Sequence, residues 1–326
     1  MSNELQRIIA ALIQLCQKHK SAPVVARSHL QQAVPISFGF KLARLLSTFQ
    51  RHQTRLAELR SRLLVLEFGG AAGTLATLSP DGSDDIGLQC QQTLAEALGL
   101  AQPDIAWHSE RDRIAEAGYY FALLTGACAK FAQDLKIMMM NEIGEASEPY
   151  AHDRGSSSTM PQKRNPIGCA YITAAASSVR HLASALGEGL AQDFERSTGP
   201  WEIEWVVLPQ ICPLTHAALR HTADLLEGLE VHEENMRKNC EMSKGLINSE
   251  AVMMRLGKTM GRQAAHDVVY DLCRKAIKED KPLVGLLVEC DEVTLEKEEL
   301  ERLCEPSSYM GLSEKMTDRV LANGNR

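Results

Sequence analysis

Residues 36–67 read ISFGFKLARLLSTFQRHQTRLAELRSRLLVLE and contain no proline and a single early glycine. Their leucines and phenylalanines recur at helical spacings, which predicts one continuous apolar face on a long helix. A helix of about thirty residues would extend roughly 45 Å at 1.5 Å per residue. Helices of this length in a soluble protein are typical of an extended bundle, often one shared between subunits.

Similar patterns extend on both sides of this segment. A shorter helix is expected over residues 5–16, and further helices over residues 84–98, 111–143, 166–192 and 202–229, while the apolar runs shorten from about residue 240 onward. No stretch alternates long enough to predict a sheet. The sequence therefore predicts an all-α fold, with a long-helix central bundle domain over residues 1–240 and a small helical C-terminal domain over residues 241–326.

Composition argues against several classes of protein. The net charge is −7, so the chain lacks the basic surplus that is typical of a nucleic-acid-binding protein. The apolar runs fall short of the ~20 residues of a membrane span, and the first residues do not read as a secretory leader. The nine cysteines match neither a disulfide framework nor a zinc motif. We therefore expect a cytoplasmic protein with no membrane partner, no metal and no cofactor.

The segment best suited to chemistry lies between two long helical patterns and reads GSSSTMPQKRNP, residues 155–166. Its hydroxyl groups could accept a proton, and Lys163 and Asn165 are donors suited to a carboxylate. Pro166 suits the first position of the following helix, whose N-terminus would favour an anion. On composition alone, a flexible surface loop is the commoner interpretation.

This loop resembles the Gly-Ser-Ser-x-Met-Pro-x-Lys-x-Asn-Pro motif of the fumarase/aspartase superfamily. One departure is Ser156, which stands where the motif has glycine, with Gly155 one position earlier. The resemblance implies that Ser157 is the catalytic base that removes a proton alpha to a carboxylate. It also implies a set of substrate-binding residues in this loop: Ser158, Met160, Lys163 and Asn165.

A second segment, ARSHLQQAVP at residues 26–35, resembles the superfamily's Gly-Arg-Thr-His-x-Gln-x-Ala-x-Pro motif. The resemblance makes His29 a catalytic acid/base or carboxylate-binding group, although a single histidine in a polar turn is more often only solvated. By the same resemblance, the glycine-rich segment at residues 70–74 is assigned to the substrate site, because small residues let the backbone approach a ligand. The alternative interpretation of this segment is a phosphate-binding loop, but the Lys-Ser/Thr pair that such a loop requires does not follow it. The substrate-binding residues implied by these two segments are Arg27, Ser28, Gln31 and Thr74.

The branch of the superfamily is indicated by Ala170. Fumarases, aspartases, argininosuccinate lyases and adenylosuccinate lyases carry at this position a glutamate that pairs with the catalytic histidine. Bacterial-type 3-carboxy-cis,cis-muconate cycloisomerases lack it, and segments 66–74, 107–113 and 199–205 also resemble that branch. The predicted function is cycloisomerisation of 3-carboxy-cis,cis-muconate or a related unsaturated polycarboxylate. In this reaction a substrate carboxylate adds across a double bond, and a proton moves alpha to a carboxylate.

Two other functions stay open: a fumarate-releasing lyase such as adenylosuccinate lyase, and a truncated, non-catalytic homologue. Superfamily members carry a further domain before the first helix seen here, so the N-terminal domain is expected to be absent. The resemblance implies a homotetramer with shared active sites and a small anionic polycarboxylate as substrate. Four residues are instead expected to be structural, as inter-helix partners or core and interface groups: His108, Arg113, Trp201 and Trp205.

Overall fold

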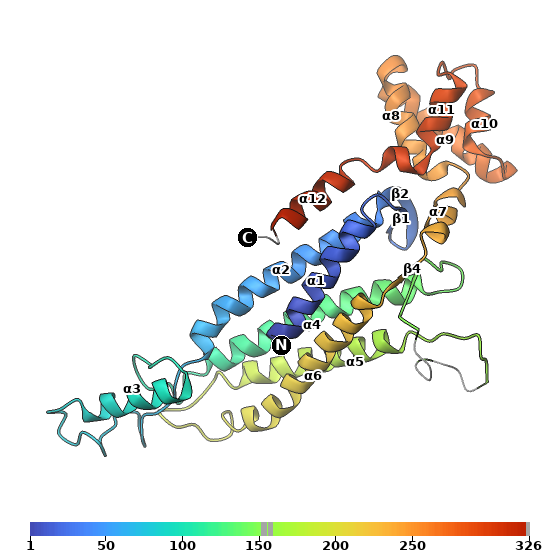
Figure 1. Cartoon of the computed structure of the whole chain (residues 1–326). Helices are drawn as coiled ribbons and strands as arrows, with labels where there is room; N and C mark the ends of the chain where they lie inside the picture. Colours follow the sequence, from blue (N-terminus) through green and yellow to red (C-terminus); the bar gives the residue numbers. More distant parts are fainter. Residues whose placement is uncertain (151–154, 156–158, 324–326) are drawn as a thin grey trace. The chain divides into compact units, whose positions relative to one another are not determined.

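The computed structural model describes residues 1–150, 155 and 159–323. These residues form twelve α-helices and two small two-stranded sheets, which confirms the all-α prediction (Figure 1). They fall into two compact units, and three of the divisions between the units lie within the first, second and fourth helices. The bundle unit comprises Met1–Ile9, Thr48–Asp134 and Ala151–Glu227, and the hairpin unit comprises Ala10–Ser47, Leu135–Tyr150 and Gly228–Arg326.

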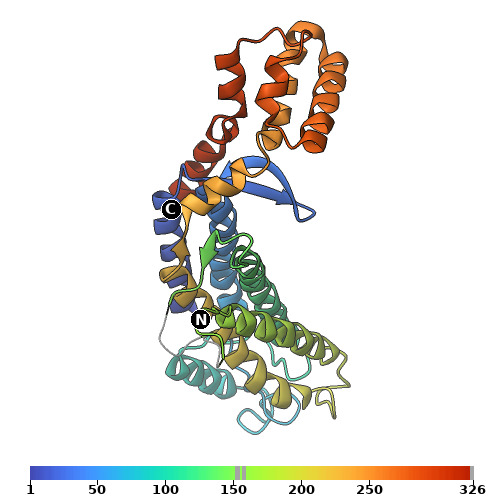
Figure 2. The ribbon, with the colours of Figure 1, turned by 90° about the vertical axis from the view of Figure 1, so that its right-hand side faces the viewer.

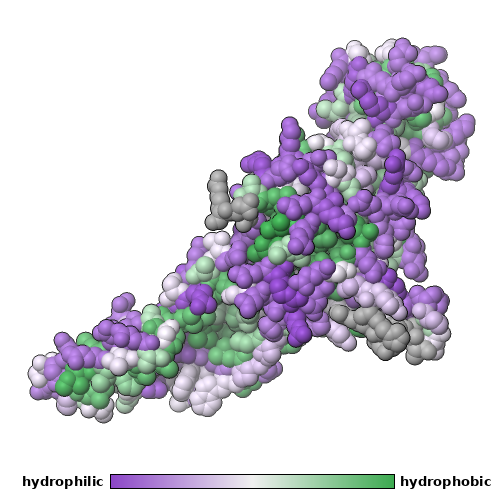
Figure 3. Space-filling model, viewed as in Figure 1, coloured by the Kyte–Doolittle hydropathy of each residue, from purple (hydrophilic) through white to green (hydrophobic). Residues whose placement is uncertain are grey.

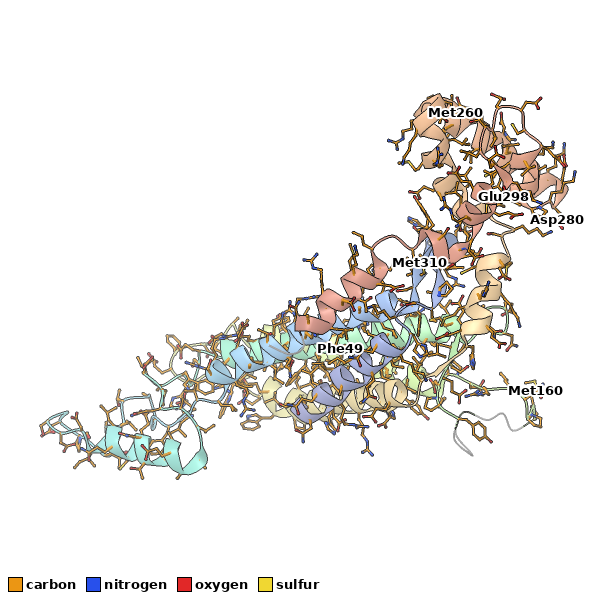
Figure 4. The ribbon with its side chains drawn as sticks, turned by 45° about the horizontal axis from the view of Figure 1, so that its top comes forward. Phe49, Met160, Met260, Asp280, Glu298 and Met310 are labelled. Carbon is orange, nitrogen blue, oxygen red and sulfur yellow. The ribbon has the colours of Figure 1, made fainter. Side chains whose placement is uncertain are left out.

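Long helices make up most of the bundle unit. In this unit α4, α5 and α6 run side by side (Figures 1 and 2), with Leu124, Ile172 and Ile211 fully buried. Phe49, also fully buried, points inward from the second helix (Figure 4). The helices that contribute to this unit are α1 (Ser2–Lys18), α2 (Phe38–Leu63), α3 (Ile86–Leu98), α4 (Asp112–Met138), α5 (Ile167–Glu188) and α6 (Ile203–Glu227).

The helices end close to the predicted boundaries. The helix predicted over residues 36–67 is α2, which ends at Leu63. The fourth long pattern is α6, which continues through both Pro209 and Pro213 as one helix. No helix in the part of the chain that the structure describes has the length and apolar character needed to cross a bilayer.

The hairpin unit contains a feature that the sequence analysis missed. Strands β1 (Pro23–Ser28) and β2 (Gln31–Ser37) pair as an antiparallel hairpin, and β3 (Ala146–Ser147) pairs with β4 (Glu230–Val231). The expectation of no sheet was therefore wrong. Both strands of the hairpin are short and carry a proline, so apolar and polar residues do not alternate clearly along them. Tertiary contacts hold them instead: β1 packs against α7 (Glu233–Glu241), and β2 against the short turns Leu246–Asn248 and Pro306–Tyr309.

The C-terminal helices have a core of their own. Buried side chains from four helices meet there, including Val252, Leu256, Val269, Leu283 and Leu300. The elements of this region are α8 (Ser249–Met260), α9 (Arg262–Glu279), α10 (Leu283–Val288) and α11 (Lys297–Cys304), followed by α12 (Ser313–Asn323).

We expect His52 to make stability depend on pH. Its ring is buried on α2 near Tyr120, and burial, with smaller contributions from Arg55 and Arg51, lowers the pKa of His52 from 6.5 to about 4. Between these two pKa values the unfolded state binds a proton that the folded state does not. Folding stability should therefore fall as the pH drops from about 6.5 toward 4, by at most about 3 kcal/mol from this group. Urea unfolding at pH 7 and pH 4.5 measures the change, and His52→Leu should flatten it. An unchanged pH slope in that variant would show that other groups cause the dependence.

Candidate functional site

The serine-rich loop is closed at its base by a backbone contact. The Asn165 N–H donates to the Gly155 carbonyl at 2.9 Å, directly before α5 begins. Gly155 has a φ of +71°, and a Cβ at this position would lie 2.7 Å from the Asn165 carbonyl oxygen. Only glycine adopts this positive φ without strain and leaves room for the Asn165 oxygen. The departure from the motif is therefore accommodated, because the glycine sits at the position where this loop closes.

The described residues of this loop face outward. Met160 and Lys163 are exposed at the surface, joined by a turn in which the Lys163 N–H donates to the Met160 carbonyl (Figure 4). Asn165 is partly buried at the start of α5. Ser157 and Ser158, the predicted base and its neighbour, lie outside the described residues. The loop thus presents a cation and an amide beside a helix N-terminus, where a carboxylate is favoured.

The histidine motif forms the turn of the hairpin in the hairpin unit. His29 and Leu30 are the two turn residues, and Ser28 pairs with Gln31 across the strands. The side chains of Ser28, His29 and Gln31 are all exposed. The structure therefore brings three of the predicted site residues together at one tip.

Arg27 behaves differently from its neighbours. Its guanidinium makes two hydrogen bonds, of 2.7 and 2.8 Å, to the carboxylate of Glu145, which is fully buried. This contact gives Arg27 a role in holding the hairpin, and its contact with substrate stays a prediction. The predicted site residues thus form two groups. Arg27, Ser28, His29 and Gln31 belong to the hairpin unit, and Thr74, Met160, Lys163 and Asn165 to the bundle unit.

A cavity of about 540 Å³ lies in the bundle unit beside the glycine-rich loop. Gly70 and Ala71 line it, whereas the predicted ligand Thr74 is exposed a few residues further on. A Cβ on Gly69 or Gly73 would come within 2.8 Å of the Ala106 methyl group, so the loop packs closely at both positions. The small residues predicted to admit a ligand therefore also let the loop lie against its neighbour.

Paired charges surround an indole ring at this cavity. His108 lies 2.8 Å from Glu67, and the backbone N–H of Trp107 donates to the same carboxylate. The Arg111 guanidinium stands over the Trp107 ring at 4.7 Å and forms a bidentate ion pair with Glu204. The Trp107 ring is buried, and His108 and Arg111 each already pair with a carboxylate, so these contacts hold the wall of the cavity in place.

Sequence reasoning did not assign this cavity to the site. Arg113 on α4 donates to the Arg62 carbonyl on α2, as expected for an inter-helix partner. His108 instead pairs with Glu67 outside any helix and lines the cavity. Trp205 is 61% exposed and contacts Trp201 edge to face, so Trp205 is not a core residue. The sequence did carry a signal for this cavity. Segments 66–74, 107–113 and 199–205, which resemble the muconate cycloisomerase branch, all contribute residues to the cavity lining.

Within residues 1–150, 155 and 159–323, no three His, Cys, Asp or Glu side chains are grouped as metal ligands.

Residues 1–180 match the family model described as "Lyase", and residues 245–320 match "Adenylosuccinate lyase C-terminus". The chain belongs to the fumarase/aspartase superfamily.

Proteins similar to this chain include a decarboxylase and muconate cycloisomerases. The chain is 51% identical over 324 residues to trans-aconitate decarboxylase 1 of Mycosarcoma maydis, covering 99% of this chain and 65% of that protein. It is 42% identical over 324 residues to the 3-carboxy-cis,cis-muconate cycloisomerase of Pseudomonas aeruginosa, covering 99% of this chain and 70% of that protein. The solved 3-carboxy-cis,cis-muconate lactonizing enzyme of Pseudomonas putida superposes with a TM-score of 0.92 at 38% identity, covering 100% of this chain and 71% of the other. The chain spans about two thirds of the length of these curated relatives.

Proposed function

We propose that the protein is an enzyme that acts on an unsaturated polycarboxylate and cycloisomerises 3-carboxy-cis,cis-muconate. The main support is the loop closed by Gly155 and Asn165, which sets Lys163 beside the N-terminus of α5. The likeness to proteins named for this reaction adds to it. The substrate would be a small anion, and the cationic and amide donors of the loop match its carboxylates.

The proposed reaction forms one bond and transfers one proton. An oxygen of a substrate carboxylate adds to a double-bond carbon, and the displaced electron pair becomes conjugated with a neighbouring carboxylate. The resulting aci-carboxylate carries additional negative charge, which Lys163 and Asn165 stabilise. Each well-placed donor contributes on the order of 3 kcal/mol to such a transition state. Protonation of the adjacent carbon completes the lactone, and in the reverse direction the Ser157 oxygen removes that proton.

The alanine at position 170 bears on the role of His29 in the proposed reaction. This residue lies on α5 and offers no carboxylate to orient an imidazole. We therefore assign His29 to binding a substrate carboxylate or donating a proton without a histidine–carboxylate pair. The same feature argues against a fumarate-releasing lyase.

A second candidate reaction is the decarboxylation of an unsaturated tricarboxylate. It is favoured by the 51% identity to a trans-aconitate decarboxylase, against 42% to the Pseudomonas aeruginosa cycloisomerase. Loss of carbon dioxide also leaves an electron pair that is conjugated with a remaining carboxylate. The same donors would stabilise that intermediate, so the two reactions differ in which bond breaks.

An assay of three substrates separates these candidates. Purified protein is supplied in turn with 3-carboxy-cis,cis-muconate, trans-aconitate and adenylosuccinate. We expect the absorbance of 3-carboxy-cis,cis-muconate to disappear without release of carbon dioxide. Carbon dioxide from trans-aconitate with muconate untouched would establish the second candidate instead, and fumarate from adenylosuccinate would contradict both.

We also propose that copies of the chain assemble into a homotetramer with shared active sites. Large apolar side chains are exposed on the bundle unit, and Figure 3 shows apolar surface in the region of α3. Leu88 and Leu98 on this helix are 53% and 58% exposed. Val206 on α6 is likewise 63% exposed. Burying such side chains against another copy is favourable. A monomer mass in light scattering would contradict this assembly.

A further inference from the structure

We propose that Glu145 is a positioning residue, which acts through Arg27 to fix the β1–β2 hairpin and so the place of His29 at its turn. The catalytic consequence rests on the proposed function, because it requires His29 to contact substrate. The anchoring of the hairpin does not depend on that function.

The contact between Glu145 and Arg27 is unusually well protected from water. Glu145 is fully buried, and the Arg27 side chain is only 16% exposed. Both carboxylate oxygens accept a hydrogen bond from the guanidinium, in the bidentate geometry that restricts an arginine most. A buried carboxylate without a partner is strongly unfavourable, so the protein keeps this pair closed.

Asn239 connects the other strand of the hairpin to the same centre. Its amide group donates to Glu145 at 2.8 Å and to the Ile143 carbonyl at 2.8 Å. The Asn239 carbonyl accepts a hydrogen bond of 3.2 Å from the Gln32 side chain. Strand β1 is thus held through Arg27 and strand β2 through Gln32, and both routes lead to Glu145.

The turn itself needs such an anchor. His29 and Leu30 have φ angles of 51° and 63°, in the left-handed region that is unfavourable for a residue with a side chain. Two-residue hairpin turns of this kind favour Asn-Gly instead. A strained turn persists where surrounding contacts fix it. Arg27 lies two positions before His29, and Figure 2 shows the turn projecting away from α7.

Hydrogen exchange tests the anchoring without any substrate. Glu145→Gln keeps the side-chain shape but removes the charge that balances Arg27. We expect backbone amides within residues 24–36 to exchange at least tenfold faster in this variant. Arg27→Lys, which keeps the positive charge and loses the bidentate contact, should have a smaller effect in the same direction and serves if Glu145→Gln folds poorly. Unchanged exchange of the hairpin in both variants would overturn the proposal.

The matched control is Glu299→Gln. Glu299 on α11 accepts a hydrogen bond of 2.7 Å from Arg255, so the chemical change is the same at a contact distant in sequence from the hairpin. Exchange of residues 24–36 should stay as in the original protein. Faster hairpin exchange in this control as well would attribute the effect to a general loss of stability and would count against Glu145.

Kinetics then tests the effect through His29. On a substrate that the protein converts, Glu145→Gln should lower kcat about tenfold and change KM less. In a His29→Gln background the same change should lower kcat no further. An equal loss in both backgrounds would show that Glu145 does not act through His29. If none of the proposed substrates is converted, the proposed function fails, and hydrogen exchange still decides the anchoring.

Discussion

Replacing Ser157 with alanine is expected to lower kcat by about 10²–10⁴-fold, the contribution typical of a positioned general base. The predicted base belongs to the segment that joins Gly155 to the loop ending at Asn165 and α5. Its hydroxyl oxygen is the only group that alanine removes, so the fold and the binding of carboxylates by Lys163 should persist. KM should therefore change much less than kcat, because the lost interaction belongs to proton transfer.

A serine on helix α2 provides the control for this prediction. Ser61 on α2 donates its hydroxyl hydrogen to the Glu58 carbonyl within the same helix. Ser61→Ala should leave kcat and the thermal midpoint unchanged. If Ser157→Ala retains full activity, another group is the base. If the original protein and the variant are both inactive yet assemble alike, the chain is a non-catalytic homologue.

Glu204→Gln is expected to give the largest loss of stability, about 3–5 kcal/mol in the free energy of unfolding. The Arg111 and Glu204 side chains are 10% and 7% exposed and share two hydrogen bonds of 2.7 and 2.5 Å. Removing the carboxylate charge leaves a buried guanidinium uncompensated beside the Trp107 ring. Urea unfolding monitored by circular dichroism measures the loss at neutral pH.

An exposed pair in the same unit is the matched control. Arg62 and Glu116 are joined by similarly short hydrogen bonds, but both side chains are substantially exposed to solvent. Glu116→Gln should therefore cause no measurable loss of stability. Equal losses in the two variants would mean that burial does not set the strength of these ion pairs.

The long helices could be predicted from sequence because their signal is local. The leucines of α2 repeat at helical spacing, and the positions of Pro23 and the glycines after Phe68 limit where helices can extend. The β1–β2 hairpin could not be predicted in this way. Its strands are short, and its turn uses His29 and Leu30 rather than the residues that favour this backbone.

Much of the site was predictable only through resemblance. The loop before α5 and the histidine turn each carry a local motif, and the structure brings Ser28, His29 and Gln31 together. The partners that hold these segments have no local signal. Glu145 is 118 positions from Arg27, and Glu204 is 93 positions from Arg111. Such contacts depend on tertiary packing. Neither the contacts of Glu145 with Arg27 and Asn239 nor the cavity lining at Trp107 therefore follows from sequence spacing.

The central claim is that this chain transfers a proton alpha to a carboxylate of an unsaturated polycarboxylate. Proton NMR of the conversion of 3-carboxy-cis,cis-muconate in D₂O tests it most directly. We predict a lactone that carries one deuterium on the carbon next to a carboxylate, formed at least a hundredfold more slowly by Ser157→Ala. Absence of the lactone, or a lactone without that deuterium, would contradict the account.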